Sequence, residues 1–180
     1  MSPGRDLRLG VGDLLSRSGT RREVIRELTM PELEVSGSSV PAGATARLDL
    51  VVESTADPST LAVTGTVVAP WQGTCRRCIE PIEGDLEVEL HEIVARDPLD
   101  EEVWALDGEE IDLGSMVREA LLLALPLAPL CSDDCRGPAP EQFPAVPAED
   151  APASVAGPPD DEPRLADPRW AALDELRFDD

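Results

Sequence analysis

The chain has 180 residues, and its 15 basic and 37 acidic residues give a formal net charge of −22. Every basic residue is arginine, because lysine is absent, and only five residues are aromatic. This size allows one ordinary domain plus a tail and excludes a large enzyme, while the charge disfavours a protein that holds nucleic acid by a broad positive surface.

The first 35 residues predict a short helix followed by a strand. Residues 11–16 favour a short helix that stops at the Ser18–Gly19 turn. Residues 21–35 are ambiguous, because their apolar residues alternate as in a strand while their glutamates also suit a helix. We favour the strand, with Pro31 marking an edge or a break.

Three later segments predict strands more clearly. Apolar and polar residues alternate over residues 46–53, 61–69 and 85–94, with Gly65 interrupting the second segment. A period of two places one face of a sheet on the core and the other in water. The short connections between these segments favour antiparallel hairpins.

One amphipathic helix follows the strands. Asp112 is a suitable N-cap residue, and Pro126 predicts that the helix finishes by Leu125. Apolar residues then recur at helical spacing on one stripe: Leu113, Met116, Val117, Ala120, Leu121 and Ala124. Packing of this stripe on the sheet predicts an α+β domain, with an antiparallel sheet that is either open or barrel-like.

The composition changes beyond Gly137. Nine of the 18 prolines lie between Pro138 and Pro168, among alanines and acids and with few large apolar residues. Such a segment cannot bury enough surface to offset its ordering entropy. We therefore expect a folded domain over residues 1–136, a disordered acidic linker over 137–166 and a short C-terminal helix over 167–177.

Four cysteines carry the chemistry that the sequence offers. Cys75 and Cys78 lie in the connection between two predicted strands, and Cys131 and Cys135 follow the predicted helix. The chain starts without an export pattern, so we expect a cytoplasmic protein whose thiols stay reduced. Two close pairs far apart in the sequence favour a tetrahedral structural zinc site. Free thiols and disulfide chemistry remain the alternatives.

Catalytic motifs are not evident, so we expect a protein that is not an enzyme. His91 is the sole histidine and has no predicted nucleophile beside it, whereas a general base needs a partner within hydrogen-bond reach. An all-thiolate zinc site leaves no open position for a reactant.

The residues resemble a known family. The runs CRRCIEPIEGDLEVELHE and EEIDLGSMVREALLLALPLAPLCSDDCRG are similar to the YceD family, known as large ribosomal RNA subunit accumulation proteins. The opening DLRLGVGDLLSRSGTRRE and the closing DPRWAALDEL also match its usual layout. Many members carry a further cysteine pair downstream, where this chain reads Gly137-Pro138-Ala139-Pro140-Glu141. Either the four cysteines are the whole ligand set, which we favour, or part of a site has been lost.

The resemblance implies a non-enzymatic factor needed for accumulation or processing of large-subunit (23S-type) ribosomal RNA. With so negative a chain, RNA contact must be local, through arginines on the hairpin tip and near the start of the chain. These candidates are Arg76, Arg77, Arg17, Arg21, Arg22 and Arg26. The alternative is an acidic, zinc-stabilised module that holds a basic ribosomal protein and affects RNA indirectly. Neither reading involves a membrane or a small-molecule substrate.

Overall fold

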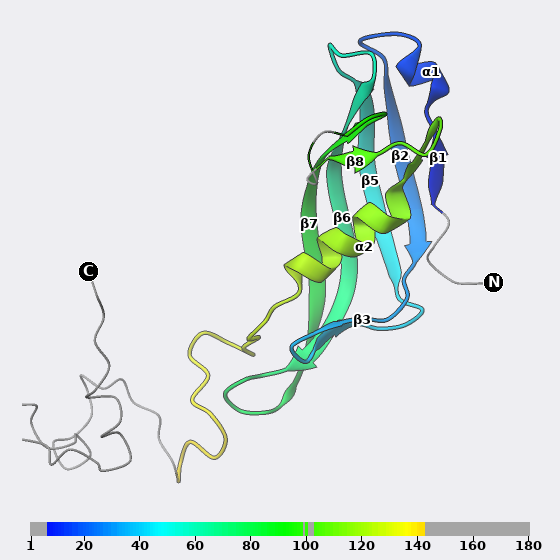
Figure 1. Cartoon of the computed structure of the whole chain (residues 1–180). Coiled ribbons are helices and arrows are strands. Elements are labelled where there is room, and N and C mark those ends of the chain that lie inside the picture. Colours follow the sequence, from blue (N-terminus) through cyan, green and yellow to red (C-terminus); the bar gives the residue numbers. More distant parts are fainter. Residues whose placement is uncertain (1–6, 99, 101–102, 143–180) are drawn as a thin grey trace, which may run out of the picture. The chain divides into compact units, whose positions relative to one another are not determined.

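Strands in which apolar and polar residues alternate form one large sheet (Figure 1). The structure is a computed structural model that describes residues 7–98, 100 and 103–142. The linker expected from residue 137 is described only as far as residue 142, and the helix expected at 167–177 lies outside the described residues. The seven strands of the sheet are β2 (Arg21–Thr29), β3 (Leu33–Val35), β4 (Ser38–Val40), β5 (Thr45–Ser54), β6 (Thr60–Thr74), β7 (Pro81–Ala95) and β8 (Trp104–Ala105).

The strand β6 organises the sheet. It pairs with β7 along its whole length, and its other edge pairs first with β5 and then, near the hairpin tip, with β4. The strands β2 and β3 extend this second side, and all of these pairings are antiparallel. Of the strands in the described residues, β8 alone pairs in parallel, beside the end of β7. The predictions of strands at 46–53, 61–69 and 85–94 are confirmed.

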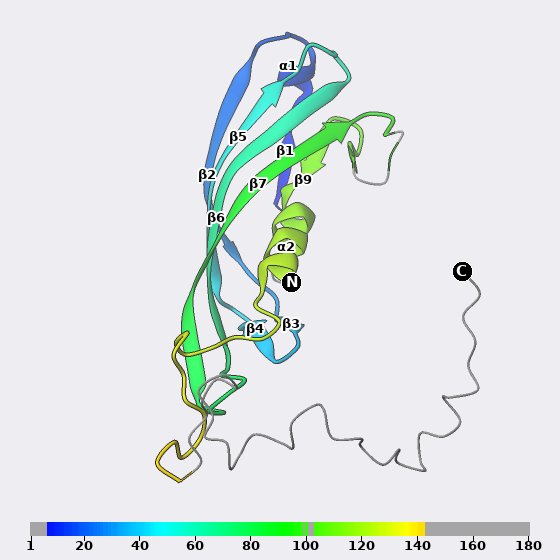
Figure 2. The same ribbon diagram turned by 90° about the vertical axis from the view of Figure 1, so that its left-hand side faces the viewer.

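The sheet is open, so the expectation that it could be barrel-like is wrong. Among the described residues, β2 and β8 each have a single strand partner, which leaves both ends of the sheet unclosed. One face is covered by α2 (Leu113–Ala124) instead of a returning strand, as Figure 2 shows. On the same side lie α1 (Gly12–Leu15) and a separate two-stranded ladder of β1 (Arg8–Gly10) and β9 (Glu110–Asp112).

The helix α2 begins and ends where the sequence predicts. The Asp112 carboxylate accepts hydrogen bonds from the backbone N–H and the hydroxyl of Ser115, at 3.0 and 2.7 Å. Leu125 is extended before Pro126 and ends the helix. The stripe facing the sheet is buried at Leu113, Met116, Val117 and Leu121. Burial of each such side chain contributes roughly 1.5–3 kcal/mol relative to exposure. At 12 residues, α2 is too short to cross a bilayer, and no other described helix meets the requirement.

Candidate metal centre

Four cysteines meet at the end of the sheet where the β6–β7 hairpin turns. Cys75 and Cys78 belong to the turn itself. Cys131 and Cys135 belong to the segment that follows α2 and passes beside that turn. The helix thus delivers the second pair to the first, as the prediction of one shared site requires.

The four sulfur atoms are spaced as a single metal ion requires. All lie within 4.8 Å of one another, with 3.8 Å between Cys75 and Cys135 and 3.7 Å between Cys78 and Cys131. For zinc–sulfur bonds of about 2.3 Å, the edge of a regular tetrahedron is about 3.8 Å. All four thiols are free of disulfides. The donor set therefore fits a closed, four-thiolate structural site.

The turn that carries the first pair is a tight knuckle. Cys75 N–H donates to the carbonyl of Glu80, and Ile79 N–H donates to the carbonyl of Cys75, at 2.9 and 3.0 Å. Ile79 has a φ of +67°, which is uncommon for a β-branched residue. Such strain persists where the surroundings fix it, often at a binding site.

Neighbouring groups shift the pKa values of Cys75 and Cys131 in opposite directions. The pKa of Cys75 falls to about 6, chiefly because the backbone N–H of Cys78 donates to its sulfur, although burial opposes the shift. The N–H of Cys131 adds a further contact to Cys75 Sγ at 3.4 Å. The pKa of Cys131 rises to about 12, because the neighbouring thiols of Cys135 and Cys78 favour its protonated form. The pKa of Cys78 is also raised, so among these three thiols only Cys75 favours the thiolate without metal. A divalent cation would favour deprotonation of its thiol ligands.

Both arginines of the CRRC motif hold the site together. Arg77 donates to the carbonyls of Asp133 and Cys135, at 2.8 and 3.1 Å, and so fixes the loop of the second cysteine pair. Arg76 donates to the carbonyls of Ser36, between β3 and β4, and Leu127, beyond α2. The structure thus gives these two candidate RNA contacts intramolecular hydrogen bonds.

The hairpin of β3 and β4 is tied to the same region. Ser38 is fully buried, and its hydroxyl donates to the carbonyl of Pro126 at 2.6 Å. The sequence did not predict this contact or the two arginine clamps, which are the hydrogen bonds of Arg76 and Arg77 to backbone carbonyls. Backbone acceptors leave no side-chain signal in a sequence.

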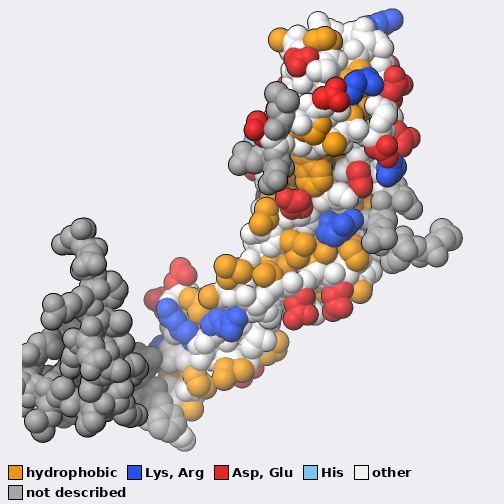
Figure 3. Space-filling view, in the orientation of Figure 1, with side chains coloured by type: hydrophobic (Ala, Val, Ile, Leu, Met, Phe, Trp, Pro, Cys, Tyr) orange, Lys and Arg blue, Asp and Glu red, His pale blue; other side chains and the backbone are white. Residues whose placement is uncertain are grey.

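The remaining candidate arginines lie towards the other end of the sheet. Arg22 donates to both carboxylate oxygens of Asp13, at 2.6 and 2.7 Å, and Arg21 pairs with Glu23 at 3.3 Å. In strand register Arg26 is level with Val67, seven residues from Thr74 at the tip, or roughly 23 Å along the strand. Arg17 precedes β2 and lies farther still. The structure therefore does not bring the six arginines into one patch. Figure 3 shows arginines beside the tip as a separate group.

Comparison with known proteins places these features in a family. The model of the large ribosomal RNA subunit accumulation protein YceD matches residues 63–177. An uncharacterized protein of Mycobacterium tuberculosis (strain H37Rv) and one of Mycobacterium bovis are each 36% identical over 145 residues, which is 77% of this chain and 65% of the relative. An uncharacterized protein of Mycobacterium leprae is 32% identical over 142 residues, or 74% of this chain and 60% of the relative. The chain thus spans about 65% of the length of the first of these relatives. No solved structure matches.

Proposed function

The chain belongs to the YceD family of large ribosomal RNA subunit accumulation proteins, and from this membership we propose a non-enzymatic factor needed for accumulation or processing of large-subunit ribosomal RNA. The family match carries the proposal, since it includes the hairpin tip, α2 and both cysteine pairs. As part of the same proposal, the protein works in the cytoplasm, where ribosomes assemble and thiols stay reduced.

Zinc is the metal that we propose for the four-cysteine site. Its role is structural, because four thiolates complete a tetrahedron and leave no position for a substrate. Cys75 and Cys78 would hold the ion from the hairpin tip, and Cys131 and Cys135 from the segment after α2. Arg77 would keep the second pair in place from outside the ligand set.

A second form of the function is favoured by the arginine contacts. Arg76 and Arg77 use their guanidinium groups on backbone carbonyls, and Arg22 is paired with Asp13. These contacts support an acidic module that holds a basic ribosomal protein, with the effect on RNA being indirect. Complementary fields would speed such an encounter and would be weakened by salt.

A deletion strain tests the family function. We expect the ratio of large- to small-subunit ribosomal RNA to fall on deletion, and to recover with the wild-type chain but not with Cys75→Ser. Ser132→Ala, in the second cysteine segment but outside the ligand set, is the matched control and should restore the ratio. An unchanged ratio in the deletion strain would contradict the proposal.

Crosslinking separates direct from indirect action. RNA recovered with the tagged protein after a high-salt wash, and lost in Arg17→Ser/Arg21→Ser, would establish direct contact. These two arginines lie away from the metal site, so their replacement leaves it intact. Recovery of a basic ribosomal protein without RNA would establish the indirect form.

A further inference from the structure

No element of the described part of the chain covers the outward face of the sheet along β6 and β7 (Figure 2). The helix α2 and the β1–β9 ladder lie on the opposite face, as Figure 2 shows. Every second residue of β7 from Glu83 to Ile93 is exposed, whereas Leu90 and Val94 are buried on the covered side. The outward residues are therefore available to a partner.

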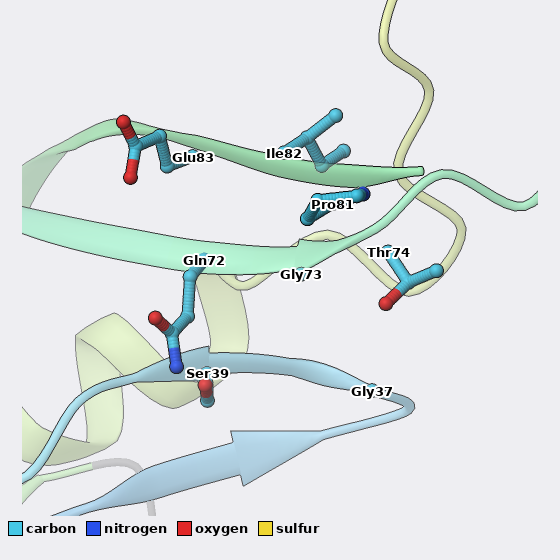
Figure 4. Close-up of a pocket in the computed structure, with 8 residues that line it drawn as sticks. All are labelled: Gly37, Ser39, Gln72, Gly73, Thr74, Pro81, Ile82 and Glu83. Carbon is cyan, nitrogen blue, oxygen red and sulfur yellow. The ribbon is translucent and has the colours of Figure 1, made fainter. Parts of the chain in front are cut away.

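A groove runs along this face towards the metal centre. A cleft of about 640 Å³ lies between β4 and the β6–β7 hairpin, with Gln72 extending towards Ser39 (Figure 4). A second hollow of about 610 Å³ lies farther along, over Thr66 and Val68. Two smaller hollows lie between them. One shares Val68 with the second hollow, the other shares Gln72 with the cleft, and both are lined by Pro70. The row of these four hollows on one face of the sheet is here named the β6–β7 groove.

One wall of the β6–β7 groove is a row of carboxylates. Glu83, Asp85 and Glu87 alternate along β7, and all three are exposed. In register they lie opposite residues of β6 that form the groove floor: Gln72, Pro70 and Val68. Among the described residues, none of these three carboxylates has an ion-pair partner within 4.0 Å. Their spacing along the strand is about 6.6–6.8 Å.

The opposite wall of the groove does not offset the negative charge of these three carboxylates. It carries Arg26 and Arg47 together with two acids, Glu27 and Asp49, so its guanidinium and carboxylate groups are equal in number. Phosphates of RNA would therefore meet more carboxylates than guanidinium groups in the groove. A second copy of this chain is disfavoured by the net charge of −22, and the chain's own residues 141–180 by their net charge of −8.

We propose that the β6–β7 groove binds an extended, basic polypeptide segment of another protein, with lysine or arginine at alternate positions. Side chains two residues apart in an extended chain repeat at the same distance as the three carboxylates, so three successive basic residues on one side can each face one acid. Val68 and Pro70 give the segment an apolar floor, between the polar side chains of Thr66 and Gln72. The source of the segment, a basic ribosomal protein, rests on the proposed function; the binding of a basic segment by the groove does not.

Peptide binding to the full zinc-loaded chain tests the groove. The probe is a fluorescein-labelled decapeptide of alternating lysine and threonine, and a peptide of the same composition with five lysines followed by five threonines controls for charge alone. We expect the alternating peptide to bind at least about fivefold more tightly. Glu83→Gln/Asp85→Asn/Glu87→Gln should weaken its binding by about tenfold.

A charge-matched variant controls for net charge. The control is a triple variant that removes three exposed acids outside the groove: Asp97→Asn/Glu109→Gln/Glu119→Gln. It should change the affinity for the alternating peptide by less than twofold. Any of three results would overturn the proposal: equal affinity for the two peptides, equal weakening of peptide binding by the two triple variants, or protection of the groove by an RNA fragment. The deletion strain's ribosomal RNA ratio is read independently, so failure of the groove leaves the family function standing.

Discussion

Removal of the metal should loosen one end of the sheet and leave the other end folded. The perturbation is either chelation of the zinc-loaded protein or the substitution Cys131→Ser. Cys78 and Cys131 are 53 residues apart in the chain, and a cross-link that closes a loop of this length reduces the entropy of the unfolded chain by about 4 kcal/mol at 25 °C. A metal bound by both segments imposes the same restriction. We therefore expect the free energy of unfolding to fall by about 4 kcal/mol and Tm to fall by roughly 10–20 °C.

Hydrogen exchange locates the effect. Between residues 72 and 85 only Cys75 is buried, whereas β5 buries Ala46, Leu48, Leu50 and Val52 in the main core. Chelation should therefore increase exchange at the β6–β7 tip and in β4, with little change in the pairing of β2 with β5. Ser132→Ala should retain metal and protection. Unchanged exchange at the tip, or metal content below about half an ion per chain, would refute the reasoning.

Three further predictions concern the clamp, the thiols and the sheet. Arg77→Ala should weaken zinc binding by about tenfold, because it removes the hydrogen bonds to two carbonyls of the second cysteine segment. Arg118→Ala on α2 should leave zinc affinity unchanged, and competition with a chromophoric chelator measures the affinity of both variants. Because the pKa of Cys131 is raised to about 12 without metal, zinc binding must displace its proton, so zinc affinity should rise with pH from 6 to 8. The released protons are taken up by the buffer, so calorimetric heats of zinc binding that do not depend on the buffer would contradict this. Gly65→Ala should destabilise the protein by about 3 kcal/mol in urea unfolding, because the φ of Gly65 is +140° and a Cβ there would lie 2.2 Å from a backbone oxygen of β5. Gly10→Ala should destabilise it by under about 1 kcal/mol, because a Cβ at Gly10 would enter open space.

The strands that the sequence predicted are those that bury one face against the core. Leu48, Leu50 and Val52 alternate with polar residues over a full strand, so their period is readable without a structure. The strands β1, β4 and β9 are three residues long and β8 is two, too short to show a period. Their positions depend on tertiary pairing, as when Arg8 to Gly10 pair with residues a hundred positions away.

The candidate site divides in the same way. Cysteine spacing predicted that the two pairs would meet, because two close pairs far apart in a sequence are typical of a four-thiolate zinc site. The four sulfur atoms do lie together. The roles of Arg76 and Arg77 were not predictable, because a guanidinium beside a cysteine pair suits RNA as well as a backbone carbonyl. Only the fold shows that the carbonyls of Ser36, Leu127 and Asp133 lie within reach.

The position of the metal centre follows from where the core ends. The strand β6 pairs with β5 only as far as Val68, and beyond this point β4 offers just two paired residues. The hairpin tip therefore extends past the hydrophobic core, with a single buried side chain, and has little apolar burial to order it. The metal that we propose, held by both cysteine segments and supported by the hydrogen bonds of Arg76 and Arg77, would replace the missing core there. It would also fix the end of the β6–β7 groove, so loss of the metal should weaken binding of a basic segment without any change in the acidic wall.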